Sequence, residues 1–300
     1  MRIIDMHCDT LTQFVPLFKN DRCVDFERMQ KNCHYTQFFA IYLPDECPNP
    51  MERIRERILF LSQELEKNKL ILANSYQDLQ ACRQENKPAV FLSIENAFMI
   101  KNRFDLEFLY ESGVRCLSLT WNHANRLAGG ALEKDAGLSD FGAEIATYAE
   151  ALGILIDLSH LNDRSFWELM PLLKKPPVAT HSNARAICPH PRNLSDAQIL
   201  EIIRKKGCVC TNAYTPFLTA QEECTLSDFL LHIEHIRHLG GENHIGFGFD
   251  FDGCELLPQN FCGVEDVKKL IRKMEQSGYS PDFIENITHK NVESVLEICL

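Results

Sequence analysis

The chain has 300 residues, of which 45% are hydrophobic and 24% are charged; this apolar content excludes a disordered chain. The formal net charge is −11, from 31 basic and 42 acidic residues, which argues against nucleic acid or an anionic membrane as the main partner. The 13 cysteines are odd in number, irregular in spacing and often within apolar runs. We therefore expect buried free thiols in a reducing compartment rather than a disulfide framework.

The first residues, MRIIDMHCDT, lack the apolar region of a secretory signal. No stretch approaches the roughly 20 apolar residues that span a bilayer. These features predict a cytoplasmic protein with no membrane contact.

Short apolar runs alternate with longer amphipathic segments along the chain. The runs are rich in β-branched and aromatic residues, as buried parallel strands are; they cover residues 2–7, 38–43, 89–95, 114–121, 154–160, 177–182, 207–214 and 244–250. Most of the gaps hold helical patterns. The segment 52–68 repeats at helical spacing, and 139–153 starts with a serine cap and ends at glycine.

This alternation of strands and helices predicts a TIM-type (β/α)8 barrel with additional C-terminal helices. The chain contains no linker and no internal repeat, so we expect a single domain over residues 1–300. The alternative is a doubly wound open sheet. It is weakened because no glycine-rich phosphate loop follows the first strand.

Metal-ligand residue types follow several of the runs, at the end of the barrel where such folds build active sites. His7 and Asp9 are two residues apart on an extended chain, so both side chains can point to the same side. Glu95 ends an apolar strand, and His160 and His181 end two successive strands. Each also has a structural interpretation: a hydrogen-bonded His–Asp pair, a salt bridge for the carboxylate, or a satisfied core histidine.

Taken together, these residues supply three imidazoles and two carboxylates, a set that suits zinc or a similar divalent ion. A single catalytic ion typically takes about three protein ligands. Two ions bridged by one carboxylate would use the whole set and leave positions open for water.

Three other residues are candidates for catalysis and substrate binding. Asp250 ends the eighth run and is free to act as a general acid/base, whereas Asp252-Gly253 indicates the following turn. Arg192, in the loop after the sixth run, either binds a substrate carboxylate or lies on the surface. Tyr214 ends the seventh run and either lines the substrate pocket or packs.

The segment HIEHIRH carries His232, His235 and His238 at three-residue spacing. Steps of three drift around a helix. We therefore expect an amphipathic surface face here rather than a metal site.

The ordered series IDMHCD, SIENA, IDLSH, ATHSNARAICPHPRN and GFGFDFDG closely resembles the membrane dipeptidase (renal dipeptidase) family of zinc peptidases. The similarity runs colinearly from residue 2 to about residue 253. It implies that His7 and Asp9 hold one zinc ion, that His160 and His181 hold a second, and that Glu95 bridges them.

The resemblance also implies that Asp250 handles the proton and that Arg192 binds the C-terminal carboxylate of a dipeptide. Members of the family often accept a D-residue at that position, and some open β-lactam rings. A homodimer is compatible with the resemblance, although no motif indicates one.

The chain departs from the mammalian members at one site position. Those enzymes place a substrate-contacting histidine directly after an LT pair on the fourth strand, whereas here LSLT is followed by Trp121, Asn122 and His123, as in bacterial-type relatives. His123 therefore either polarises the substrate or merely packs. The lack of a signal peptide and a lipid-anchor signal also indicates a cytosolic, bacterial-type member.

We therefore predict a zinc-dependent dipeptidase that acts through a hydroxide bridging two metal ions. One alternative is a binuclear metal hydrolase that acts on another amide or a lactone. The other is a barrel that binds metal without turnover, against which the intact Asp250, Arg192 and five ligands argue.

Overall fold

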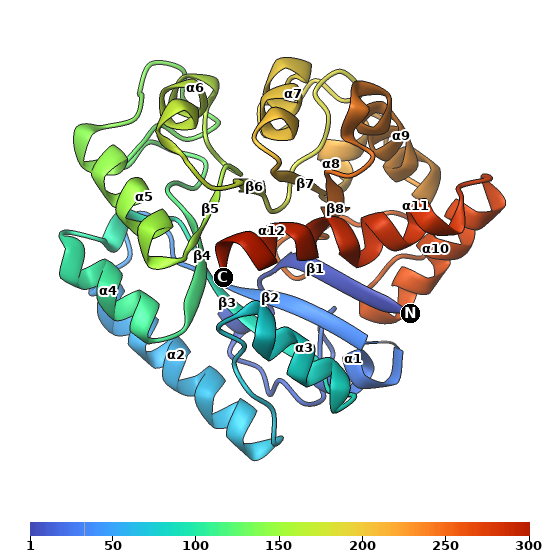
Figure 1. Ribbon diagram of the computed structural model, residues 1–300, viewed down its shortest axis with the longest axis horizontal. Helices are drawn as coiled ribbons and strands as arrows, with labels where there is room; N and C mark the ends of the chain where they lie inside the picture. Colours follow the sequence, from blue (N-terminus) through green and yellow to red (C-terminus); the bar gives the residue numbers. More distant parts are fainter. Residues whose placement is uncertain (33) are drawn as a thin grey trace.

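In a computed structural model that describes residues 1–32 and 34–300, eight parallel strands close into a barrel in chain order (Figure 1). The strands are β1 (Arg2–Cys8), β2 (His34–Tyr42), β3 (Ala89–Glu95), β4 (Val114–Ser118), β5 (Leu155–Asp157), β6 (Val178–Ala179), β7 (Cys208–Thr211) and β8 (Ile245–Phe247). β1 pairs with β8 through Asp5 and Phe247, which closes the sheet. The predicted TIM-type barrel is confirmed, and the open sheet is excluded.

Several strands are shorter than the apolar runs that predicted them. The runs 154–160 and 244–250 extend beyond β5 and β8 because the chain turns sharply there. His160 and Asp250 have φ angles of 70° and 63°, a left-handed conformation that a strand does not contain. These turns carry two of the predicted site residues.

Helices surround the barrel and follow its strands (Figure 1). They are α1 (Phe26–Asn32), α2 (Pro50–Lys67), α3 (Tyr76–Gln84), α4 (Arg103–Glu111), α5 (Asp140–Leu152), α6 (Asp163–Leu169), α7 (Asp196–Arg204), α8 (Thr215–Leu218), α9 (Leu226–Ile236), α10 (Val267–Gln276), α11 (Pro281–Glu285) and α12 (Asn291–Cys299). Both predicted helices are present. Ser139 caps α5 by accepting a hydrogen bond from the Gly142 N–H, and Gly153 ends it at φ 94°.

The last helix, α12, crosses the centre of the barrel in Figure 1. Its buried residues Val292, Val295 and Leu296 join the inward side chains of the strands, including Cys208 and Cys210, in one apolar cluster. Asn291 at the start of α12 donates hydrogen bonds to carbonyls around the start of β8. One of the additional C-terminal helices, α12, therefore closes the end of the barrel at which the strands begin.

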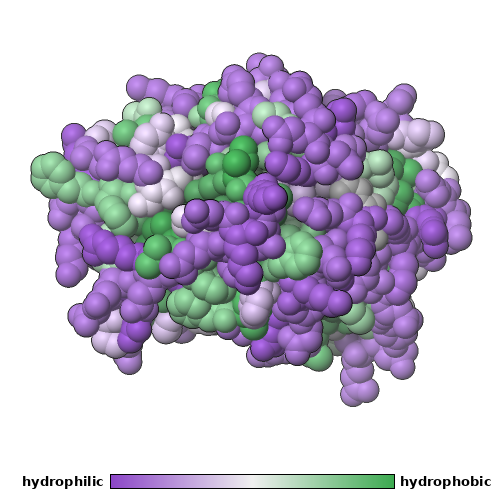
Figure 2. All heavy atoms as spheres, turned by 90° about the horizontal axis from the view of Figure 1, so that it is seen from below, coloured by the Kyte–Doolittle hydropathy of each residue, from purple (hydrophilic) through white to green (hydrophobic). Residues whose placement is uncertain are grey.

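The cysteines outside position 33, which lies beyond the described residues, are free thiols and mostly buried. This confirms the expected thiol state for the described part of the chain. The face in Figure 2 is mainly hydrophilic, with apolar side chains in separate groups. Among the described residues, no helix has the length and apolar character needed to cross a membrane.

Candidate metal centre

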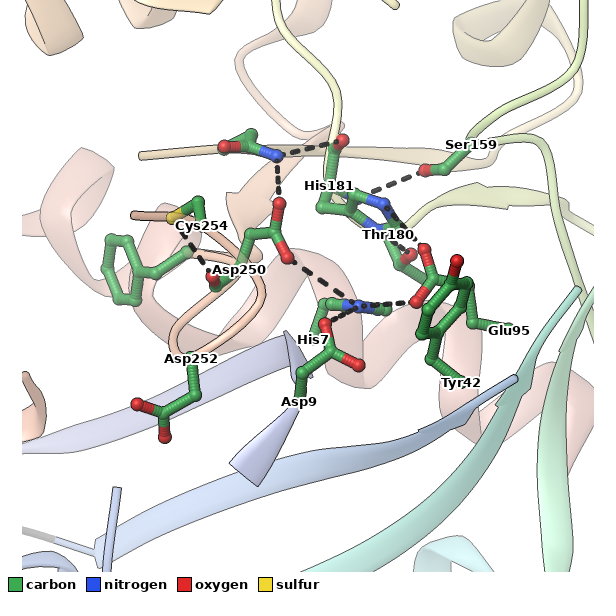
Figure 3. Close-up of polar contacts among 12 residues, drawn as sticks. His7, Asp9, Tyr42, Glu95, Ser159, Thr180, His181, Asp250, Asp252 and Cys254 are labelled. Carbon is green, nitrogen blue, oxygen red and sulfur yellow. Dashed lines mark hydrogen bonds and ion pairs between the residues drawn. The ribbon is translucent and has the colours of Figure 1, made fainter. Parts of the chain in front are cut away.

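The five predicted ligand residues meet at the C-terminal end of the barrel, and Figure 3 labels four of them. They come from the ends of four strands: His7 and Asp9 from β1, Glu95 from β3, His160 from β5 and His181 from β6. All five are buried. Because the strands are parallel and adjacent in the barrel, residues 174 positions apart in the sequence become neighbours.

Glu95 lies between two groups of these side chains. One of its oxygens, Oε2, is 3.6 Å from His7 Nε2, which is itself 3.4 Å from Asp9 Oδ2. The other oxygen, Oε1, is 2.7 Å from His160 Nε2 and 3.8 Å from His181 Nε2. Each carboxylate oxygen therefore faces a different group.

The donor chemistry of the histidines fits a bound cation. His160 Nδ1 lies 3.0 Å from Asn122 Oδ1, and His181 Nδ1 lies 2.8 Å from Thr180 Oγ1. Ring protons at these Nδ1 atoms leave two Nε2 lone pairs facing each other at 2.8 Å. The buried Nε2 of His7 has no hydrogen-bond partner among the described residues. A cation between such nitrogens would remove their repulsion and satisfy them.

Asp250 lies beside this cluster, with Oδ1 3.8 Å from His7 Nε2. The ligand atoms of His7, Asp9 and Asp250 lie within 4.8 Å of one another, as do those of His7, Glu95 and His181. Burial, opposed by the nearby His7, raises the pKa of Asp250 to about 7. A carboxyl group with this pKa can take up and release a proton near neutral pH.

Asp252 points away from His7 in Figure 3. Its carboxylate accepts hydrogen bonds from Thr10 Oγ1 at 2.5 Å and from the Cys23 N–H at 2.9 Å. This geometry agrees with the choice of Asp250, rather than Asp252, as the candidate acid/base.

A cavity of about 440 Å³ opens onto the cluster, and Arg192 and Tyr214 both line it. Arg192 is buried, and its Nε has no hydrogen-bond partner among the described residues. Its Nη2 donates to the His181 carbonyl at 3.4 Å, and burial lowers its pKa. A buried guanidinium with an unsatisfied donor is a suitable partner for an anion. The surface alternative for Arg192 is wrong.

His123 does not reach the cavity. Its ring is exposed, with Nδ1 3.4 Å from Glu133 Oε1 on the outer side of the loop after β4. Trp121 and Asn122 line the cavity instead, and the Trp121 ring lies 6.2 Å from that of His160. His123 is thus absent from the lining of this cavity, and its contact with substrate stays a prediction.

Two residues at the cavity were missed in the sequence. Asn212, two residues before Tyr214, donates from Nδ2 to Asp250 Oδ2 at 2.9 Å. Tyr42, the last residue of β2, also lines the cavity. Both lie at strand ends, so the rule that selected Tyr214 could have found Tyr42, and it would have found Asn212 had it included amide side chains.

The expectation for HIEHIRH is wrong at its first histidine. His232 is completely buried, accepts the Ala184 N–H at Nδ1 and contacts the Leu218 carbonyl through Nε2. His238 is exposed. The three histidines therefore do not share one surface face.

A scan against protein-family models matches residues 1–299 to the membrane dipeptidase family, peptidase family M19. Among curated proteins, an uncharacterized protein from the pqqA 5′ region of Klebsiella pneumoniae is 32% identical over 264 residues, covering 83% of this chain and 97% of the relative.

Two solved structures are also similar. The dipeptidase AC of family M19 has a TM-score of 0.90 at 26% identity, over 100% of this chain and 98% of the other. A metallo-peptidase from Rhodobacter sphaeroides, bound to a phosphinate mimic of the dipeptide L-Ala-D-Ala, has a TM-score of 0.89 at 25% identity, over 100% and 99%. The chain belongs to the membrane dipeptidase family, peptidase family M19, and is a metallo-dipeptidase.

Proposed function

We propose that this chain hydrolyses dipeptides with two zinc ions at the end of the barrel. His7 and Asp9 would hold one ion, His160 and His181 the other, and Glu95 would bridge them. The observation that carries the proposal is the position of Glu95, which presents Oε2 to His7 at 3.6 Å and Oε1 to His160 at 2.7 Å. When bound, such ions polarise a carbonyl group and make water nucleophilic near neutral pH.

Asp250 is the proton carrier in this proposal. Its pKa of about 7 allows it to accept a proton from the attacking water and return it to the leaving amine. The amide of Asn212 holds Oδ2 at 2.9 Å, which leaves Oδ1 to face the reacting groups.

Arg192 limits the substrates to short peptides. Its unsatisfied Nε would pair with the free carboxylate of a dipeptide, and Tyr214 would line the same pocket. A longer peptide would bury an uncharged amide against the guanidinium, which costs the charge-assisted hydrogen bonds. We further propose substrates with a D-residue at the C-terminal position, because the similar Rhodobacter sphaeroides enzyme binds a mimic of L-Ala-D-Ala.

The test is amino-acid release from L,L- and L,D-dipeptides, matched tripeptides and C-terminally amidated dipeptides, with zinc and with a chelator. We expect chelator-sensitive hydrolysis of the dipeptides alone, restored by zinc. Arg192→Met should lower kcat/KM for dipeptides by about a hundredfold or more, as loss of a buried charge pair implies. Equal activity on amidated dipeptides would contradict the role of Arg192. Bound metal without dipeptide release would instead direct the search to other amides and lactones.

We also propose that residues 1–300 form one domain of a cytosolic, bacterial-type enzyme. The closed barrel and the packing of α12 against β7 and β8 support the single domain. The free thiols of the described cysteines suit a reducing compartment. We propose a homodimer as well, on the resemblance alone, and the molar mass of the protein in solution tests it.

A further inference from the structure

Asp157, the last residue of β5, is a buried carboxylate beneath the proposed metal centre, and its side chain is not a ligand. It accepts four hydrogen bonds. Oδ1 accepts the backbone N–H groups of Ser159 and Thr180, each at 2.9 Å. Oδ2 accepts the hydroxyl groups of Ser118 at 2.5 Å and Thr180 at 2.7 Å.

Two of these contacts lead to His181. The Thr180 hydroxyl donates its only proton to Asp157, so its oxygen is free to accept from His181 Nδ1 at 2.8 Å. This chain of contacts keeps the ring proton on Nδ1 and directs the Nε2 lone pair into the site. Figure 3 shows Thr180 and Ser159 beside His181.

A third contact leads to His160. Asp157 accepts a hydrogen bond from the N–H of Ser159, the residue directly before His160. His160 has a φ of 70°, which is unfavourable for a residue other than glycine. The Ser159 hydroxyl also accepts the backbone N–H of His181 at 3.1 Å. One carboxylate therefore holds both chain segments that present the histidines of the same proposed ion.

We propose that Asp157 is a positioning residue for the ion held by His160 and His181, acting on His181 through Thr180 and on His160 through Ser159. This inference rests on the proposed function, since it assumes that both histidines bind one ion. A carboxylate behind a ligating histidine fixes its tautomer and raises its basicity, and loss of such a group costs about 10- to 100-fold in metal affinity.

The test measures zinc affinity by competition with a chromophoric chelator, on the full chain. Thr180→Val keeps the shape of the side chain but removes the hydroxyl. We expect one of the two ions to bind about 10- to 100-fold more weakly, with the other ion unchanged. Thr180→Ser, which retains the hydroxyl, should restore the affinity, and Asp157→Asn should weaken the same ion as Thr180→Val.

Ser118→Ala is the matched control, because it removes a donor to Asp157 without a link to either histidine. It should leave both affinities unchanged. If Asp157→Asn fails to fold, the comparison of the Thr180 variants decides the question, with the melting temperature of each variant measured in parallel.

Three results would overturn the inference. Thr180→Val could bind both ions as tightly as the wild type, or Thr180→Ser could fail to restore affinity. Both ions could also weaken together as the melting temperature falls, which a purely structural role would produce. Wild-type protein that binds no zinc would overturn the proposed function as well, so the two failures are distinguishable.

Discussion

The two ends of the barrel are built from the same strands but carry opposite kinds of side chain. At the C-terminal end, which we call the mouth, buried carboxylates and imidazoles such as Glu95 and His181 lie close together. At the other end, which we call the base, Val295 and Leu296 of α12 pack on apolar and cysteine side chains. Burial of apolar groups stabilises the base, whereas burial of polar and charged groups at the mouth destabilises the fold unless they are paired.

This contrast shows how one barrel separates stability from chemistry. In such folds the residues at the strand C-termini serve catalysis and those at the opposite face serve stability. Changes at the mouth should therefore alter turnover with little loss of stability. Changes at the base should lower stability with little effect on turnover.

The largest expected effect is at the mouth. Asp250→Asn should lower kcat by at least about a hundredfold, because the amide cannot carry the proton. Metal content and melting temperature should stay near those of the wild type, since the variant loses a buried charge and keeps the side-chain shape. Asp252→Asn is the control: its carboxylate contacts Thr10 and Cys23 instead, so kcat should fall far less. Steady-state kinetics with near-normal turnover for Asp250→Asn would refute the assignment.

At the base, Leu296→Ala should lower the free energy of unfolding by about 2–5 kcal/mol, the cost of removing a fully buried leucine. Leu296 is 0% exposed and distant from the mouth, so kcat/KM at low temperature should be unchanged. Ile298→Ala on the same helix, where the side chain is 54% exposed, should change stability by less than about 0.5 kcal/mol. Urea denaturation measures both variants. A loss of turnover that matches the loss of stability would break the separation of the two ends.

The strands and the meeting of the five candidate ligands at the mouth were predictable because both depend on local pattern. An apolar run limits where a strand can lie, and in a barrel the residue at its C-terminal end must lie near the mouth, as Glu95 does. Colinear motifs then pointed to the family, which the match over residues 1–299 confirms.

The directions of loop side chains were not predictable in this way. Asn122 lines the cavity beside His160, whereas the His123 ring lies next to Glu133, ten residues further along the chain. The burial of His232 likewise depends on Ala184 and Leu218, which belong to other segments. Such contacts are tertiary, and helical spacing alone does not contain them.

A smaller effect is expected at Gly253, where the mouth has no room for a side chain. A Cβ there would lie 2.2 Å from Asp9 Oδ2 and 2.4 Å from Asp250 Oδ1. Gly253→Ala should therefore displace both carboxylates and lower kcat/KM by about a hundredfold, as a misplacement of about 1 Å can. Leu256→Ala, an exposed change in the same loop, should leave kinetics unchanged. Wild-type kinetics for Gly253→Ala would mean that the carboxylates have more freedom than this structure indicates.

The smallest effect concerns a buried histidine on α9 that is outside the candidate metal cluster. Burial lowers the pKa of His232 from its ordinary value of 6.5 to about 4. Because the folded pKa is the lower one, its contribution to stability is complete above pH 6.5 and is lost as the pH falls towards 4. Between pH 7 and 5 this one group should cost about 2 kcal/mol of unfolding free energy.

Urea denaturation of His232→Gln at pH 7 and pH 5 isolates that contribution. The amide can replace one acceptor or donor contact but does not titrate, so the loss of stability between the two pH values should be about 2 kcal/mol smaller than in the wild type. His238→Gln, at an exposed position on the turn after α9, should keep the wild-type dependence. The histidines at the mouth are common to all three proteins, so their contribution cancels in the comparison. An identical pH dependence in all three proteins would contradict this contribution of His232. The acid sensitivity of the fold would then originate in titratable groups at the mouth, and the two ends would also differ in how their stability responds to pH.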